Sequence, residues 1–148
     1  MPFDPLNFSP PFGQAIGLEF MQIENGELTV RAPYAEHLVG DPDTGVIHGG
    51  VITAMLDNAC GRVVQHAREH AAGTASGAIA TLDLRIDYMG PAAPGKDLYA
   101  KALCYRLTRN VAFVRARAYT DDPDDPIATC VATFMLGTPS ERPPESTP

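Results

Sequence analysis

Apolar residues predominate between Val51 and Val64, where they fall on almost every side of a helical projection. A glycine-rich turn at residues 45–50 precedes this stretch. From Val51 to Val64 the only polar residues are Thr53, Asp57, Asn58 and Arg62. A helix that is apolar nearly all round is buried rather than lying on a wet surface. We therefore predict one long buried helix from about Gly49 to about His70, with a single carboxylate, Asp57, inside its apolar run.

Alternating apolar and polar positions predict strands on both sides of this helix. The clearest alternation covers residues 80–88, where every second residue is apolar, as expected of a half-buried strand. A hairpin is predicted around Asn25-Gly26, a strong turn signal. The predicted strands are residues 18–23, 28–32, 80–88, 98–107, 111–120 and 127–136. Residues 11–16 are predicted as a short helix, 34–39 as a helical turn, and 40–45 and 71–77 as loops.

This order of elements, two strands, one helix and four meandering strands, predicts a two-layer α+β domain. One antiparallel sheet of roughly six strands covers only one side of the helix, so we expect a second copy of the domain to cover the other. We predict a single domain at residues 1–137, with an N-terminal arm and short helix at 1–17. The polar, proline-rich residues 138–148 are predicted to be a disordered tail.

Charge and cysteine content narrow the class of protein. A net charge of -7 argues against nucleic acid or an anionic membrane as the main partner, and an anionic small ligand would need a local basic patch. Cys60, Cys104 and Cys130 sit in apolar surroundings without metal-ligand spacing, as in a reducing compartment. With no leader pattern and no apolar run of 18 residues, we expect a soluble, cytoplasmic protein that does not enter a membrane.

Two stretches of the chain resemble a known family. His48-Gly49-Gly50, followed seven residues later by Asp57, and residues 81–92 look like the corresponding parts of hotdog-fold acyl-CoA thioesterases of the phenylacetyl-CoA and 4-hydroxybenzoyl-CoA type. The resemblance extends over roughly residues 18–137. It implies a hotdog fold, with one long central helix wrapped by the sheet, and hydrolysis of an aromatic or medium-chain acyl-CoA. It further implies no metal or cofactor, and a homodimer or a homotetramer built as a dimer of dimers.

The resemblance also implies roles for individual residues. Gly49 takes the position whose backbone N–H polarises the thioester carbonyl. Asp57 takes that of the catalytic carboxylate, as nucleophile or general base, and Thr81 that of a hydroxyl near the attacking water. His48 completes the motif and is expected to orient the loop rather than act as an acid or base. Pro42, flanked by Asp41 and Asp43, stands where many members have an asparagine.

Elementary chemistry supports this assignment independently. Thioester hydrolysis needs an oxyanion donor and a group that supplies or activates the nucleophile. A glycine N–H at the start of a helix is unpaired and lies at the positive end of the helix dipole. Gly49 and Asp57 are eight residues apart, which is about 12 Å along a helix. One thioester carbon cannot lie within about 3 Å of both, so if both act they come from two chains related by a two-fold axis.

Each candidate also has a purely structural interpretation. The His48-Gly49-Gly50 motif is also typical of a tight turn. Asp57 is also compatible with a buried carboxylate whose hydrogen bonds are made by the helix or its neighbours, and Thr81 with an ordinary threonine on the face of a sheet. The predicted substrate contacts are Gly50, Asn58, Arg109 and Arg115. Asn58 is also compatible with a hydrogen bond at an interface. The basic residues of the last strands are compatible with either a coenzyme A phosphate site or a solvated face of the sheet. The alternative function is a non-catalytic acyl-CoA or acyl-ligand binding protein on the same fold.

Overall fold

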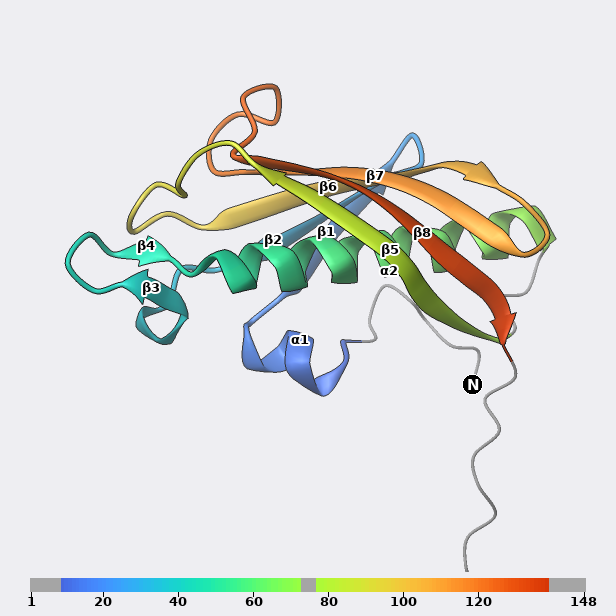
Figure 1. The fold of residues 1–148 in the computed structure, drawn as a ribbon, viewed down its shortest axis with the longest axis horizontal. Coiled ribbons are helices and arrows are strands. Elements are labelled where there is room, and N and C mark those ends of the chain that lie inside the picture. Colours follow the sequence, from blue (N-terminus) through green and yellow to red (C-terminus); the bar gives the residue numbers. More distant parts are fainter. Residues whose placement is uncertain (1–8, 73–76, 139–148) are drawn as a thin grey trace, which may run out of the picture.

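The computed structural model describes residues 9–72 and 77–138, and Figure 1 shows one long helix lying under a curved sheet. The long helix is α2 (Gly49–Ala72), accompanied by the short helix α1 (Pro11–Ala15) and the 3-10 turn η1 (Glu36–Leu38). The strands are β1 (Glu19–Glu24), β2 (Glu27–Ala32), β3 (Val39–Asp41), β4 (Val46–Ile47), β5 (Ala78–Tyr88), β6 (Leu98–Leu107), β7 (Val111–Tyr119) and β8 (Ala128–Thr138).

The main sheet has six strands in the order β1-β2-β6-β7-β8-β5, and every neighbouring pair is antiparallel. The predicted α+β architecture, a hotdog fold with one central helix and a six-stranded antiparallel sheet, is therefore confirmed. The predicted hairpin is also present: Asn25 and Gly26 both have positive φ, at 52° and 78°, as the tight turn between β1 and β2 requires.

One face of α2 forms the centre of the core. Met55, Leu56, Val63 and other side chains on this face are fully buried in one cluster with the inward residues of β2, β6, β7 and β8. Many of the facing sheet residues are alanines, which let the helix backbone lie close to the sheet. The fully buried alanines of β6 and β7 are Ala100, Ala102, Ala112 and Ala118.

The opposite face of α2 is open in the single chain. Thr53, Ala54, Asp57, Asn58 and Gly61 recur at helical spacing and are all half-buried. In one chain the helix, and Asp57 with it, is therefore shielded on one side, because one sheet can cover only one side of a helix. Full burial of the helix stays a prediction for the dimer. This open face is the surface for which the sequence predicts a second copy as cover.

Four strands of the main sheet each contain one extra residue, which in β8 is Gly137. Met21 in β1, Leu82 in β5 and Tyr105 in β6 have no partner in register on the neighbouring strand. Each of the three side chains is about half exposed, at 46%, 50% and 52%. Such bulges increase the local twist of a strand and bend it. The bulges therefore help the sheet to curl around α2 (Figure 1).

The loop predicted at residues 40–45 is partly wrong, because β3 and β4 form a small hairpin there. The Asp41 carboxylate closes its turn by accepting hydrogen bonds from Asp43 N (3.0 Å) and Thr44 Oγ1 (2.8 Å). The predicted loop at 71–77 is shortened by α2, which runs to Ala72. Residues 73–76 of that loop, the first part of the arm (1–8) and most of the predicted tail (139–148) lie outside the described residues.

Candidate active site

Asp57 and Thr81 come together on the open face of α2. The hydroxyl of Thr81 in β5 donates a hydrogen bond of 3.0 Å to Asp57 Oδ1. Thr81 is exposed and Asp57 is half-buried, so the carboxylate is held in place and still reachable from solvent. The other carboxylate oxygen has no hydrogen-bond partner among the described residues. An oriented, accessible carboxylate has the form that a nucleophile or a general base requires.

The bulge at Leu82 determines where Thr81 points. Thr81 pairs with the buried Phe134 of β8, and the next pair in register is Asp83 with Thr133. Paired residues of antiparallel strands face the same side of a sheet, so Thr81 faces α2 and Asp83 faces away. If residues 81, 82 and 83 instead alternated regularly, Thr81 would face away from the helix together with Asp83. The regular alternation read from the sequence does not reveal this change of side.

The turn before α2 fixes the peptides on both sides of Gly49. Val51 N donates to His48 O (2.9 Å), and Gly50 N donates to His48 Nδ1 (2.8 Å). His48 Nδ1 is thus occupied as a hydrogen-bond acceptor, and the imidazole orients the turn. Within the described part of the chain, the N–H of Gly49 has no acceptor, as expected at the first position of a helix. Of the predicted site residues, Gly49 therefore offers a free donor, whereas Gly50 does not.

Tyr88 and Thr53, which the sequence analysis did not single out, contact the same turn. Tyr88 Oη at the end of β5 donates to Gly49 O (3.3 Å), and Thr53 Oγ1 donates to the same oxygen (3.2 Å). The two hydroxyls also lie within hydrogen-bond reach of each other, and because each has a single hydrogen, either one donates to the other only when it does not donate to Gly49 O. The only sequence signal was the position of Tyr88 at the end of an alternating strand, which gave no indication of this contact.

Gly40 is a third residue that sequence reasoning missed. A Cβ on Gly40 would lie 2.8 Å from the Cα of His48, so only glycine fits there without moving the backbone. His48 N also donates to Leu38 O at 2.9 Å. The hairpin formed by β3 and β4 thus packs against His48, and His48 in turn holds Gly50.

Asn58 does not reach the open part of the site. A Cβ on Gly13 of α1 would meet Asn58 Nδ2 at 3.5 Å, so this side chain lies under α1. Its Oδ1 is buried without a hydrogen-bond partner among the described residues. The placement favours the packing interpretation of Asn58 over a substrate contact.

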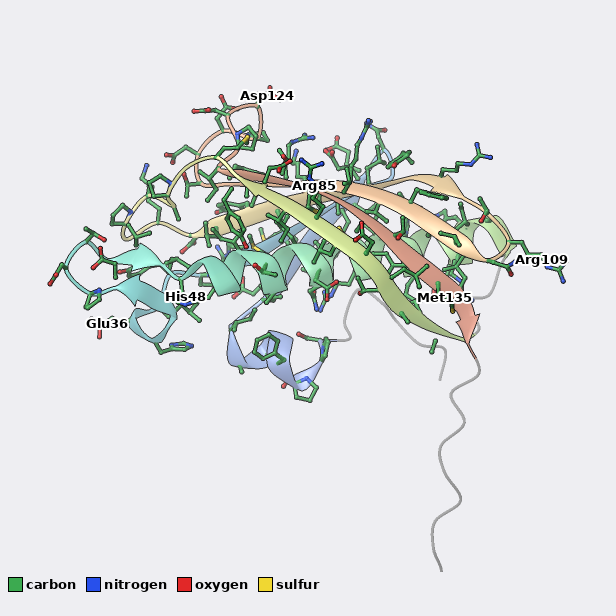
Figure 2. The ribbon with its side chains drawn as sticks, viewed as in Figure 1. Glu36, His48, Arg85, Arg109, Asp124 and Met135 are labelled. Atoms are coloured by element: carbon green, nitrogen blue, oxygen red, sulfur yellow. The ribbon has the colours of Figure 1, made fainter. Side chains whose placement is uncertain are left out.

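The two predicted coenzyme A ligands lie away from Asp57 in the same chain. Arg109 sits in the turn between β6 and β7, and Figure 2 shows it at the opposite end of the molecule from His48. Arg115 alternates with the buried residues of β7 and so points to the outer face of the sheet. Its guanidinium lies 5.7 Å from the ring centre of Tyr105. Figure 2 shows Arg85 on this same outer face.

Pro42, at the position of the family asparagine, is exposed in the turn of the β3–β4 hairpin. The neighbouring Asp41 uses its carboxylate to close that turn, and these hydrogen bonds lower its pKa. The Asp41 carboxylate is therefore engaged in the turn in this chain.

Cys60 lies one turn of α2 beyond Asp57 and contacts Cys130 of β8, with 3.8 Å between the two sulfur atoms. Donating a hydrogen bond to Cys130, together with burial, raises the pKa of Cys60 well above its usual value. Accepting that bond lowers the pKa of Cys130. Both thiols are buried, so they belong to the core and not to the open face.

Among residues 9–72 and 77–138, no three His, Cys, Asp or Glu side chains are grouped so that they could hold a metal ion. Within the same residues, no helix has both the length and the apolar character needed to cross a membrane.

Comparison with known proteins places this geometry in a family. Residues 44–127 match the family model of the thioesterase superfamily. A medium/long-chain acyl-CoA thioesterase of Salmonella typhimurium, YigI, is 30% identical over 86% of each chain. A crystal structure of a Pseudomonas aeruginosa protein is 44% identical, with a TM-score of 0.72 over 84% of this chain and 88% of that one.

The fold also matches more distant structures. A mutant of the phenylacetic acid degradation protein PaaI from Thermus thermophilus superposes with a TM-score of 0.69, at 24% identity, over 86% of this chain and 99% of that one. This match concerns the fold alone. The family-model match covers more than half of the chain, and the identity to YigI extends over most of it. The chain therefore belongs to the thioesterase superfamily, the hotdog-fold thioester hydrolases.

Proposed function

We propose that this protein hydrolyses the thioester of an aromatic or medium-chain acyl-CoA, with Asp57 as nucleophile or general base. One observation carries the proposal: the Asp57 carboxylate stands on the open face of α2, oriented by the Thr81 hydroxyl. The name of the Salmonella typhimurium relative, a medium/long-chain acyl-CoA thioesterase, supports acyl-CoA as the substrate class.

The reaction replaces the carbon–sulfur bond of the thioester with a carbon–oxygen bond. Either the Asp57 carboxylate attacks the carbonyl carbon and water then cleaves the resulting anhydride, or Asp57 takes a proton from the attacking water. Negative charge develops on the carbonyl oxygen in both routes, and the free N–H of Gly49 is the donor that stabilises it. Coenzyme A leaves as the thiolate and gains a proton, so the products are a carboxylic acid and free coenzyme A.

The site is composed of two chains. Gly49 and Asp57 belong to one continuous helix and are separated by about 12 Å along its axis. Two copies of α2, packed antiparallel on their open faces, bring Gly49 of one chain next to Asp57 of the other. Such an isologous dimer contains two equivalent sites. It also covers the half-buried stripe that the single sheet leaves open.

A second feature supports this dimer. β5 is a terminal strand of the main sheet and is eleven residues long, so its outer edge offers a row of backbone donors and acceptors. Exposed edges of this length readily pair with another chain. Pairing of two β5 edges would join the two sheets and place both α2 helices on the same side.

The function is tested by thiol release from a panel of aromatic and medium-chain acyl-CoAs, with wild type and Asp57→Asn compared. Asn keeps the size of the side chain but is neither basic nor nucleophilic, so kcat should fall by about two orders of magnitude or more. The melting temperature should hold or rise, because a half-buried charge has been removed. Wild-type protein that binds acyl-CoA without releasing thiol would support the non-catalytic binding alternative instead.

The two-chain site has its own test. Gly49→Val blocks the approach to the oxyanion donor, and a Cβ at Gly49 would lie at an ordinary contact distance, 3.8 Å, from Tyr88 Cε1. Gly49→Val and Asp57→Asn homodimers should both be inactive. After joint unfolding and refolding, about half of the dimers are mixed, and each holds one intact site, which gives about a quarter of wild-type activity. A verified heterodimer without activity would rule out the composite site.

A further inference from the structure

Tyr88 contacts the candidate oxyanion donor from a different element of the fold. Its hydroxyl, at the end of β5, donates to the carbonyl oxygen of Gly49 at 3.3 Å. We propose that Tyr88 is a positioning residue, which holds the Gly49 N–H in the direction that the developing oxyanion requires. The inference rests on the proposed function and identifies a further residue on which its site depends.

The peptide between Gly49 and Gly50 is held at both of its polar ends. Its N–H, that of Gly50, donates to His48 Nδ1 at 2.8 Å. Its carbonyl oxygen, that of Gly49, accepts hydrogen bonds from Thr53 Oγ1 and Tyr88 Oη. The preceding peptide is fixed separately, because His48 O accepts from Val51 N at 2.9 Å. The Gly49 N–H belongs to this preceding peptide, so Tyr88 acts on it through the Gly49 backbone that joins the two peptides.

This turn needs such contacts more than most helix starts do. Two consecutive glycines have no Cβ to restrict their backbone, and His48, Gly49 and Gly50 are all exposed. Thr53 belongs to the same helix and moves with it. Tyr88 belongs to the sheet, so its hydrogen bond ties the start of α2 to the strand that also carries Thr81. The strand β5 thus holds both the Gly49 donor and the Thr81 hydroxyl of one chain, which belong to different sites of the proposed dimer.

The ring of Tyr88 contributes a second contact. Its Cε1 lies 3.8 Å from the place where a Cβ on Gly49 would be, and it is the one described atom within 4 Å outside the adjacent residues and the helix backbone. The ring therefore flanks the otherwise open side of Gly49. Because it lies beside this residue, it limits the directions from which a carbonyl can approach the N–H.

Tyr88→Phe removes only the hydroxyl and keeps the ring. Loss of one hydrogen bond that orients the donor should lower kcat by about three- to tenfold. KM should change by less than about twofold, because the oxyanion contact strengthens mainly in the transition state. The melting temperature should be nearly unchanged, since the hydroxyl is exposed. Purely structural support would instead lower the melting temperature and leave kcat in the folded fraction intact.

Tyr34→Phe provides a matched control. The Tyr34 hydroxyl also donates to a backbone carbonyl, that of Gly45 at 3.1 Å, but in the β3–β4 turn and not at Gly49. This variant should keep the wild-type kcat. Thr53→Val removes the second hydroxyl from the Gly49 oxygen and gives an independent variant should Tyr88→Phe fold poorly. In the double variant Tyr88→Phe/Thr53→Val, the loss of kcat should differ from the combined losses of the two single variants, because both groups act on one carbonyl.

The possible outcomes separate the two proposals. A wild-type protein that cleaves no acyl-CoA overturns the proposed function itself. An active wild type, with Tyr88→Phe and Thr53→Val both at the wild-type kcat, overturns only the role of Tyr88. A loss of kcat that equals the loss in Tyr34→Phe would likewise overturn it. A selective fall of kcat in Tyr88→Phe at unchanged KM and melting temperature supports it.

Discussion

His48 illustrates how a single side chain in the motif is used. Its Nδ1 accepts the Gly50 N–H, its carbonyl accepts the Val51 N–H, and its own N–H donates to Leu38 O. All three bonds organise the turn. A histidine in a catalytic motif is often assigned to proton transfer. The hydrogen bonds of His48, however, are those of a residue that orients the backbone around Gly49.

The cysteines give a prediction at the same scale. Cys60 is fully buried, and its pKa is raised by its hydrogen bond to Cys130 and by burial. Only the thiolate reacts with disulfide reagents, so a raised pKa and full burial both slow modification. Cys104 is only half-buried, although burial raises its pKa too. We expect Cys104 to be labelled in the native protein, and Cys60 only after unfolding.

Mass spectrometry of the labelled peptides at pH 8, with increasing denaturant, measures this order. Labelling of Cys60 should follow the global unfolding transition, because the core around it opens only then. Rapid labelling of Cys60 in native buffer would mean that α2 separates from β8 far below the unfolding midpoint.

At the scale of elements, the sequence predicted the strands and helices well and their local irregularities poorly. The strand boundaries followed from alternation and from turn residues such as Asn25-Gly26, because both act within a few residues. The bulge at Leu82 could not be predicted from such local signals, because it depends on how β5 pairs with β8, and these two strands are far apart in the sequence. In this strand the alternation of residues 80–88 is misleading, because Leu82 is exposed although Leu84 and Ile86 pack on the core.

The candidate site was predictable to a similar extent. Gly49 and Asp57 lie within one helix and its cap, so their placement followed from local pattern. The contacts of Tyr88 and Gly40 depend on tertiary packing and carried no local signal. Asp57 was expected to be fully buried because the composition of α2 suits cover on both sides, whereas a single chain supplies only one.

Thr81 provides the prediction at the scale of elements, because the bulge turns it toward α2. Thr81→Val keeps the shape of the side chain and removes the hydrogen bond to Asp57. If the hydroxyl orients the carboxylate or its water, kcat should fall about tenfold, with a small change in KM. Thr81→Ser should retain most of the activity. Steady-state kinetics of the three proteins measure the effect.

Thr133→Val is the control, because this threonine lies on the neighbouring strand and pairs with Asp83 on the outer face. It should be as active as wild type. Equal activity of Thr81→Val and Thr133→Val would identify Thr81 as an ordinary sheet threonine.

At the scale of the whole molecule, the net charge of -7 makes the binding of an anionic substrate depend on local cations. We propose Arg109 as the better candidate for the coenzyme A phosphates. It lies at the end of the molecule opposite His48, and antiparallel packing of two α2 helices would bring that end of one chain toward the N-terminal end of the other (Figure 2). Arg115 is on the outer face of the sheet, over Tyr105.

Arg109→Ala should therefore raise KM several-fold at an unchanged kcat, because a phosphate contact is uniform in the ground and transition states. The effect should shrink at high salt, which screens exposed charges. Arg115→Ala is the matched control and should leave KM unchanged. The reverse result, with KM raised only in Arg115→Ala, would move the phosphate site to the outer face of the sheet.

The bulge in β5 also affects how this chain is compared with its relatives. Leu82 is the one residue of β5 between Thr81 and Asp83 that has no counterpart on β8. Removing it would make the strand regular, and Thr81, Leu84 and Ile86 would still lie on one face. A relative one residue shorter here can therefore keep the same side chains toward its helix. In an alignment with such a relative the gap belongs at Leu82, because a gap anywhere else in β5 would pair residues from opposite faces of the sheet.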